Sequence, residues 1–386
     1  MAQDNFIDEL MGFDPATAVT AFEVKPENEN GDGNKKYVNP NIYKTNPANS
    51  VSEDGHYHSK VRVLLNPYDI KHSIVHQVRY NMRDERGFFP AISLLSVGNK
   101  ECPIFKGWKQ LWYAKKADPS DATKIIEDTA KKDWAKKYFS KSESDWVLIQ
   151  IIEDENQPAL VGQFKVMKIA KAILNRLTAK MNPSDPKKQK QPLMDYIFGP
   201  VLEMDVVPGP DDPNAPERKQ REVNYDLCDF DTDPMPIIKV DGTPLFTDEE
   251  IELIEDYNTA NTDMVKAKTT AKAEAAKAKK EELAPQIRPL YAKALDYMKA
   301  NAINLEMECG YMPWSEELTT RVNAWLDKVL NMIAPVEEKS TESKTPEAPA
   351  KLTEKIPAES TGKMPASTAA PSNDPFDAGG DTDLPF

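Results

Sequence analysis

Short stretches in which apolar and polar residues alternate recur between residues 57 and 227, and they constrain the fold more than any other feature of the chain. Alternation with a period of two residues is typical of a half-buried β-strand. A helical spacing of apolar residues over 163–177 predicts one helix among the strands. The strands are predicted at 60–65, 73–80, 88–96, 146–152, 201–207 and 222–227.

Short strands with a single intervening helix are typical of a small β-barrel of the oligonucleotide-binding (OB) type. After residue 246 the apolar spacing becomes helical, with Pro285 and Pro289 as predicted breaks and Ser315 as the N-cap of the last helix. Helices are predicted at 248–257, 262–283, 289–302 and 316–333. The predicted fold class is therefore α+β: an OB-fold-like β-barrel with insertions, followed by a helical region and a disordered acidic tail.

Composition sets the predicted domain limits. Hydrophobic residues make up 40% of the 386-residue chain, and its 31 prolines are many, so part of the chain is expected not to fold. We predict a flexible N-terminal arm and linker at 1–55 and the OB-fold-like core at 56–246. The helical region follows at 247–334, and 335–386 is predicted to be a disordered tail, with ten acidic and five basic residues.

Basic residues and aromatic rings gather in one part of this acidic chain. The net charge is −14, which excludes an ordinary basic nucleic-acid binder unless the charges are segregated. Residues 106–141 contain ten lysines against five acidic residues, with tryptophans, tyrosines and one phenylalanine among them. Lysines that contact phosphates and rings that stack bases are what a groove for single-stranded nucleic acid requires. A lysine-rich helix whose rings face the core is the alternative interpretation.

Other sequence features narrow the class of protein. The three cysteines lie far apart and form no CxxC pair, which is typical of a reducing compartment. No window approaches 18 apolar residues, and the N-terminus lacks the features of a signal peptide. We therefore expect a cytoplasmic protein with no membrane partner, and we predict no cofactor.

The C-terminus carries a second signal. The last 14 residues contain four aspartates and no lysine or arginine. A terminal phenylalanine can fill an apolar pocket of a partner, its α-carboxylate can pair with an arginine, and the aspartates can lie along a basic ridge. An acidic tail that only improves solubility is the alternative. The predicted partner-binding residues are Asp381, Asp383, Leu384, Pro385 and Phe386.

The chain from about 57 to 230 resembles the single-stranded-DNA-binding proteins of T-even-type phages, with the corresponding pieces in the same order. The pieces are VRVLLNP at 61–67, an aromatic hairpin at 76–96 with Gly87-Phe88-Phe89, the Cys-Pro segment Glu101-Cys102-Pro103-Ile104, Lys137-Tyr138 and Lys141 before the strand at 146–152, the basic helix at 165–177, and Asn224-Tyr225-Asp226. The last residues resemble instead the tip of bacterial single-stranded-DNA-binding proteins, which recruits repair and replication enzymes.

The resemblance implies a non-enzymatic protein that coats and protects single-stranded DNA in replication, recombination and repair. It also implies recruitment of replication and repair enzymes through the tip, in a host cytoplasm if the chain is phage-encoded. Some of the implied rings are expected in the core, Trp112 and Trp146 first. The implied DNA-binding residues are Arg79, Tyr80, Arg83, Arg86, Phe88, Phe89, Lys106, Trp108, Lys109, Trp112, Tyr113, Lys115, Lys116, Lys136, Lys137, Tyr138, Lys141 and Tyr225.

The chain departs from the phage family in two respects. That family builds a zinc subdomain from one histidine and three cysteines. Here His76 and Cys102 fall at matching places, but Leu94 or Leu95 and Phe105 stand near the other two, and two ligands cannot make a closed tetrahedral site. We therefore predict no metal, although all four histidines lie within 21 residues and another ligand set is conceivable. The family's basic N-terminal arm is also unmatched, since residues 1–50 hold four lysines and eight acidic residues.

Three alternatives stay open on the sequence. A metal-dependent nuclease would use Asp229, Asp231 and Asp233, with Asp226 nearby, to bind Mg²⁺. Aspartates before a proline are common in turns, however, and no further catalytic motif accompanies them. A structural or assembly protein without affinity for DNA is the second alternative. RNA in place of DNA is the third, because stacking surfaces serve both.

Overall fold

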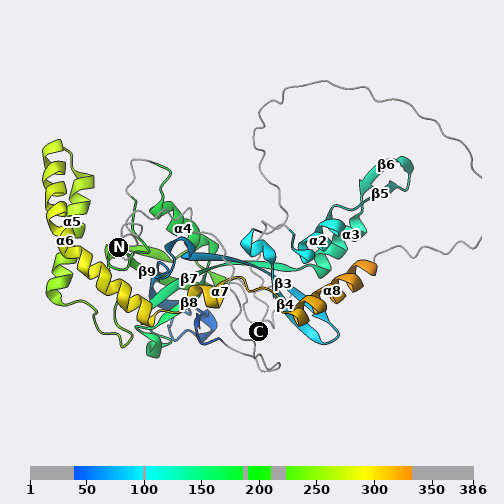
Figure 1. The fold of residues 1–386 in the computed structure, drawn as a ribbon, viewed down its shortest axis with the longest axis horizontal. Helices are drawn as coiled ribbons and strands as arrows, with labels where there is room; N and C mark the ends of the chain where they lie inside the picture. Colours follow the sequence, from blue (N-terminus) through cyan, green and yellow to red (C-terminus); the bar gives the residue numbers. More distant parts are fainter. Residues whose placement is uncertain (1–38, 99–100, 186–189, 210–222, 333–386) are drawn as a thin grey trace, which may run out of the picture.

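A computed structural model of the chain describes residues 39–98, 101–185, 190–209 and 223–332 (Figure 1). These residues form an α+β fold, as predicted, with a nine-stranded mixed sheet, a separate two-stranded hairpin and helices at both ends of the sheet. The strands are β1 (Ile42–Tyr43), β2 (Tyr57–Leu64), β3 (Ile74–Asp84), β4 (Gly87–Ile92), β5 (Lys115–Asp118), β6 (Asp121–Glu127), β7 (Lys141–Asp154), β8 (Phe164–Ile169), β9 (Pro200–Pro208), β10 (Val223–Asn224) and β11 (Asp229–Pro234). The helices are α2 (Pro103–Trp112), α3 (Thr129–Tyr138), α4 (Lys171–Met181), α5 (Asp248–Lys266), α6 (Thr270–Asn301), α7 (Leu305–Cys309) and α8 (Glu316–Asn331).

The long strand β7 connects two separate hydrophobic cores. Its second half pairs with β2, and its first half pairs with β3, so that β2 and β3 follow one another along the same edge. β8 pairs along the other edge. The second half, from Val147 to Ile152, is wholly buried and rich in β-branched residues, whereas the first half is polar and partly exposed. The same strand therefore belongs to a deep core at one end and to an exposed ribbon at the other.

The first core lies around β2, β7, β8 and β9 and is covered by α4 and the second half of α6. β1 pairs with β8 in parallel, and β9 carries β10 and β11. Within the described residues the strand path ends at β1 on one side and at β10 on the other, so the sheet is open. The predicted closed barrel is therefore wrong for this part of the chain, because no pairing joins the two outer strands.

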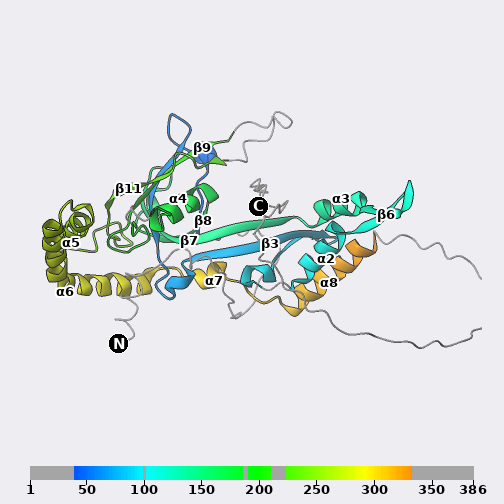
Figure 2. The same cartoon turned by 90° about the horizontal axis from the view of Figure 1, so that it is seen from above.

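The second core lies around the β3–β4 hairpin, α2, α3 and α8. We call this part, together with the β5–β6 hairpin, the distal lobe; Figure 2 shows it at the far end of β3 and β7 from α5 and α6. The side chain of Ser315 accepts a hydrogen bond from Leu318 N at 3.1 Å, which confirms it as the N-cap of α8. One apolar face of α8, including Val322 and Trp325, is buried in the distal lobe.

Two predicted helices have different limits. The segment predicted as a helix at 163–177 is a strand, β8, followed by α4 after Ala170. Its apolar residues fit both periods, and pairing with β7 decides in favour of a strand. The predicted breaks at Pro285 and Pro289 are also wrong, because α6 continues through both. Both prolines are exposed, so the carbonyl groups that lose a partner can bind water, and Figure 1 shows α6 bent along its length.

The segment before β2 is attached to the sheet where the sequence predicted a linker. Tyr43 of β1 is buried, and its hydroxyl donates to Asp154 at 2.7 Å. Tyr57 at the start of β2 donates to the same carboxylate oxygen at 2.9 Å. Residues 1–38 and the predicted tail, with the partner-binding tip, lie outside the described residues.

Candidate nucleic-acid interface

A column of aromatic rings runs along α2. Phe105, Trp108 and Trp112 stand three and four residues apart, which places them on one face of the helix. The centroids of Phe105 and Trp108 lie 5.4 Å apart, those of Trp108 and Trp112 lie 5.3 Å apart, and both pairs are stacked. Trp108 is buried and anchors the column in the second core, while its two neighbours are partly buried. Tyr113 follows the helix and is 64% exposed, with its ring edge-on to Trp108.

Lysine ammonium groups lie over these rings. Lys109 Nζ is 5.2 Å from the centroid of Phe105, and Lys132 Nζ is 4.9 Å from that of Trp112. Such cation–π contacts at exposed sites contribute about 0.5–1 kcal/mol each. They hold positive charge beside the aromatic surface, which is where the phosphates of a strand with stacked bases would lie.

A second pair of rings lies on α3. The centroids of Trp134 and Tyr138 are 4.4 Å apart, and Lys137 Nζ lies 5.6 Å and 5.2 Å from them. The indole N–H of Trp134 donates to the carbonyl oxygen of Val329 on α8, at 3.3 Å. This contact fixes α3 against α8 and therefore fixes the position of the lysines that α3 carries.

The distal lobe contains lysines of two kinds. Several are paired with acidic neighbours, such as Lys132 with Glu127 at 3.0 Å and Lys136 with Asp133 at 3.2 Å. Others have no acidic side chain within 4.0 Å among the described residues: Lys106, Lys109, Lys115, Lys131 and Lys137. Exposed ion pairs are weak, at about 0–1 kcal/mol, so even the paired lysines can exchange a carboxylate for a phosphate.

Three of the predicted stacking rings are not accessible. Tyr80 is 1% exposed, Phe89 3% and Trp108 4%. The guanidinium of Arg321 on α8 covers the ring of Phe89 at 4.1 Å from its centroid. Trp112, which we expected in the core, is only partly buried. The rings of Tyr80, Phe89 and Trp108 stabilise the distal lobe, and a base could reach them only if the second core opened.

The hairpin of β3 and β4 presents a different set of side chains to solvent. Arg83 and Arg86 are exposed, and Phe88, directly across from Arg83, is 44% exposed. Arg79 is partly buried, and burial lowers the pKa of its guanidinium. Asp84 pairs with Arg321 through two hydrogen bonds of 2.7 Å and 2.8 Å, which lower the pKa of that carboxyl to about 2.

All of the predicted DNA-binding residues except one lie in the distal lobe or at the start of β7, which pairs with β3. Tyr225 packs partly buried against the first core instead. The remaining residues lie on β3, β4, α2, β5, α3 and the start of β7: Arg79, Tyr80, Arg83, Arg86, Phe88, Phe89, Lys106, Trp108, Lys109, Trp112, Tyr113, Lys115, Lys116, Lys136, Lys137, Tyr138 and Lys141. The structure thus brings together side chains that span more than sixty positions of the sequence.

Sequence reasoning missed the β5–β6 hairpin. Ile125 on β6 is 72% exposed, and Lys116 lies opposite the neighbouring Ile126 in the pairing with β5. The two adjacent isoleucines next to Lys124 were the available signal, since β-branched residues favour a strand. The hairpin therefore adds an exposed apolar side chain, Ile125, next to Lys124 in the distal lobe.

The ligand sets that the sequence left as alternatives are not assembled in the described part of the chain. His76 Nδ1 lies 2.9 Å from the carboxylate of Asp145, and the thiol of Cys102 accepts a hydrogen bond from Ser93. The aspartates of β11 are exposed, and Asp229 pairs with Lys180 at 2.6 Å. Among the described residues, neither the His76–Cys102 pair nor these aspartates belongs to a set of three ligands close enough to share a metal.

Comparison with known proteins does not identify the chain. No protein-family model matches it, and no curated protein matches it significantly. None of the helices in the described ranges has the length and hydrophobicity of a membrane span.

Proposed function

We propose that the chain is a non-enzymatic protein that binds and protects single-stranded DNA, with the distal lobe as its binding surface. The observation that carries this proposal is the ring column of α2 with lysine ammonium groups over it: Lys109, which has no acidic partner among the described residues, and Lys132, which pairs with Glu127. Rings stack bases of any sequence, and lysines contact the backbone, so the binding would be largely independent of sequence.

The stacking residues of this proposal are the rings that solvent reaches. Tyr113 and Phe88 are exposed, and Trp112 is partly buried. Alanine substitution of a ring that stacks one base costs about 1–3 kcal/mol. Tyr113 carries the largest share of the expected affinity because its ring is the most exposed of the three.

The five lysines that have no acidic partner within the described ranges set the expected dependence on salt. If each neutralises one phosphate, the logarithm of the binding constant falls with the logarithm of the salt concentration with a slope of about −3.5. Affinity would then fall about 100-fold between 50 and 200 mM salt.

The proposal includes two further parts. The first is that the first core is an open variant of the OB fold. The antiparallel pairing among β2, β7, β8 and β9 supports this part. The second is recruitment of replication and repair enzymes by the C-terminal tip, supported only by its sequence. A peptide of the last residues should bind such an enzyme, and removal of Phe386 should abolish the binding.

The assay that tests the proposal is fluorescence anisotropy with labelled oligo-dT and the matching duplex, over a series of salt concentrations. Tight binding selective for the single strand and weakened by salt is expected, with oligo-U as the test of RNA. Absence of binding to oligo-dT at low salt, in the full chain and in a chain without 373–386, would favour the assembly-protein alternative. DNA cleavage that requires a metal and is lost in D231N would favour the nuclease.

A further inference from the structure

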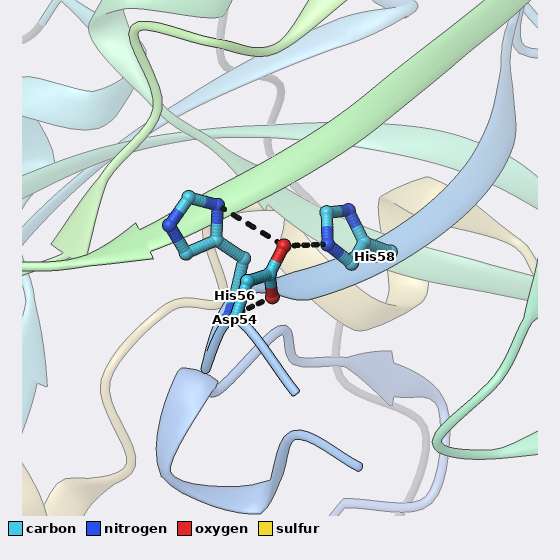
Figure 3. Close-up of side chains that lie close together, drawn as sticks. All are labelled: Asp54, His56 and His58. Atoms are coloured by element: carbon cyan, nitrogen blue, oxygen red, sulfur yellow. Dashed lines mark hydrogen bonds and ion pairs between the residues drawn. The ribbon is translucent and has the colours of Figure 1, made fainter. Parts of the chain in front are cut away.

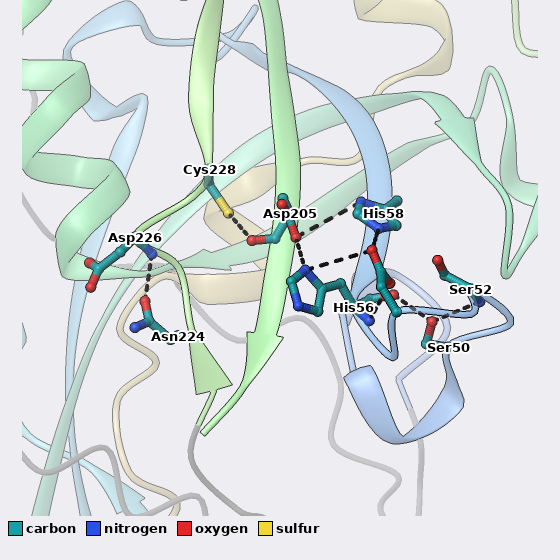
Figure 4. Close-up of polar contacts among 9 residues, drawn as sticks. Ser50, Ser52, His56, His58, Asp205, Asn224, Asp226 and Cys228 are labelled. Atoms are coloured by element: carbon teal, nitrogen blue, oxygen red, sulfur yellow. Dashed lines mark hydrogen bonds and ion pairs between the residues drawn. The ribbon is translucent and has the colours of Figure 1, made fainter. Parts of the chain in front are cut away.

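Two histidines and two aspartates meet at the junction of β2 and β9, far in sequence from the groups discussed above. Figure 3 shows His56 and His58 on either side of the carboxylate of Asp54. Asp54 Oδ2 lies 2.9 Å from His58 Nε2 and 3.9 Å from His56 Nδ1. Asp205 on β9 adds a second carboxylate, with Oδ1 2.8 Å from His56 Nδ1 (Figure 4). Two imidazoles thus lie within reach of two carboxylates.

Local structure explains why these side chains converge. His58 is the second residue of β2, and His56 directly precedes the strand, two positions away. In the pairing of β2 with β9, His58 stands directly opposite Asp205. The turn before β2 contains Gly55 with a φ of 76°, which brings the chain back so that Asp54 lies beside the strand. One oxygen of Asp54 accepts a hydrogen bond from His56 N at 2.8 Å, which leaves Oδ2 facing the imidazoles.

The separations of these atoms suit a small divalent cation. Bonds of about 2.0–2.1 Å in a tetrahedral site place neighbouring ligand atoms about 3.4 Å apart. The distances of 2.9 Å and 3.9 Å from Asp54 Oδ2 to His58 Nε2 and His56 Nδ1 lie on both sides of this value, whereas Asp205 lies 2.8 Å from His56 Nδ1 and faces the other ring nitrogen of His58, Nδ1, at 3.9 Å. Small rotations of exposed side chains would equalise them. Ligand atoms of Asp54, His56 and His58 all lie within 4.8 Å of one another, and no other such set of three occurs in the described residues.

Charge and access favour the same ligand. The two carboxylates of Asp54 and Asp205 together carry a charge of −2, which a divalent cation neutralises. The four side chains are between 26% and 48% exposed, so the ion can enter from solvent. Nitrogen and oxygen ligands of this kind suit zinc and neighbouring transition metals better than calcium or magnesium. Cys228 lies nearby, but its thiol is buried and donates to the carbonyl oxygen of Asp205, so it is not among the ligands.

We propose that Asp54, His56 and His58 form a binding site for zinc or a similar divalent transition metal, with Asp205 as a second carboxylate beside His56. The site joins the turn before β2 to β9, at an edge of the first core. It is independent of the distal lobe, so its test and the test of DNA binding can fail separately. It also differs from the His76 and Cys102 set, which the resemblance suggested and for which we predicted no zinc.

The test is titration of metal-free full-length protein with Co²⁺, followed by visible absorption. Wild type should bind one Co²⁺ with the intense bands of tetrahedral nitrogen and oxygen ligands, without a thiolate charge-transfer band, and Zn²⁺ should displace it. The double variant H56Q/H58Q should not bind at concentrations that saturate wild type. H72Q is the matched control, because His72 pairs with one carboxylate, Asp69, at 2.7 Å and should bind as wild type does.

Three results would overturn the site: no Co²⁺ binding by wild type, equal binding by H56Q/H58Q, or a thiolate charge-transfer band. If the double variant fails to fold by circular dichroism, D205N supplies the second test. It removes a negative charge beside the site without removing a histidine and should weaken binding. Unchanged Co²⁺ affinity in D205N, together with a misfolded double variant, would also contradict the proposal.

Discussion

Trp325 of α8 supports the proposed DNA-binding surface from behind. Its side chain is 4% exposed, and its ring packs edge-on against Phe139 with centroids 5.2 Å apart. Its indole N–H donates to the carbonyl oxygen of Arg83 on β3, at 3.1 Å. The residue therefore links α8, the end of α3 and the β3–β4 hairpin. We predict that W325A unfolds or loosens the distal lobe and leaves the first core folded.

The magnitude follows from burial. A buried tryptophan removes about 150–250 Å² from water, which at about 25 cal/mol per Å² gives an upper limit of about 4–6 kcal/mol. Substitutions of buried Phe or Trp by Ala cost about 3–5 kcal/mol. We expect W325A to lower the free energy of unfolding of the distal lobe by an amount in this range, which is enough to unfold a small lobe.

Hydrogen exchange read by mass spectrometry measures the effect in each lobe. In W325A, the amides of β4, α2 and α3 should lose protection from exchange, while those of β2 and β9 should keep it. The affinity for oligo-dT should decrease as well, because the binding surface lies on the distal lobe. L295A is the matched control, since Leu295 of α6 is 1% exposed in the first core and should give the opposite pattern. Equal loss of protection in both lobes, or full oligo-dT affinity with an unprotected lobe, would refute the reasoning.

Two further substitutions test other parts of the account. Y113A should raise the Kd for oligo-dT about 5- to 150-fold, the equivalent of about 1–3 kcal/mol, whereas Y68A, at a tyrosine 45% exposed and outside the distal lobe, should leave it unchanged in the same anisotropy assay. The hydrogen bond to Asp145 raises the pKa of His76 above its value in the unfolded chain. The contribution of this hydrogen bond to stability is therefore full below about pH 6.5 and is lost as the pH rises through the pKa of the folded state. The difference in unfolding free energy between wild type and H76Q should therefore be larger at about pH 5.5 than at about pH 9. An equal difference at the two pH values would contradict this prediction.

The buried strands were predictable from the sequence because burial leaves a pattern. The stretch at 146–152 is apolar except for Gln150, and it contains the buried half of β7. The other half of β7, from Lys141, is polar because both faces of the ribbon reach solvent, so no pattern marked it. Its pairing with β3 joins residues some sixty positions apart, which local spacing cannot show.

The candidate site was predictable in composition and not in detail. Lysine and aromatic content located the distal lobe, but which rings are buried depends on α8, whose Arg321 covers Phe89. From the sequence we predicted that the helices after residue 246 form a separate region. In the structure α8 completes the second core, and α6 covers the first. The cluster at Asp54 was missed because its fourth member, Asp205, arrives through the pairing of β2 with β9.

The most direct test of the central claim is the salt dependence of oligo-dT binding in a charge variant of the distal lobe. The variant replaces the five lysines without acidic partners, Lys106, Lys109, Lys115, Lys131 and Lys137, by glutamine. A control variant of equal charge replaces Lys239, Lys266, Lys268, Lys272 and Lys277, all exposed and outside the distal lobe. The account predicts that the slope of the logarithm of affinity against the logarithm of salt becomes shallower by about 3.5 in the first variant and is unchanged in the control. Equal slopes in wild type and both variants would show that DNA, if bound, does not lie on the distal lobe.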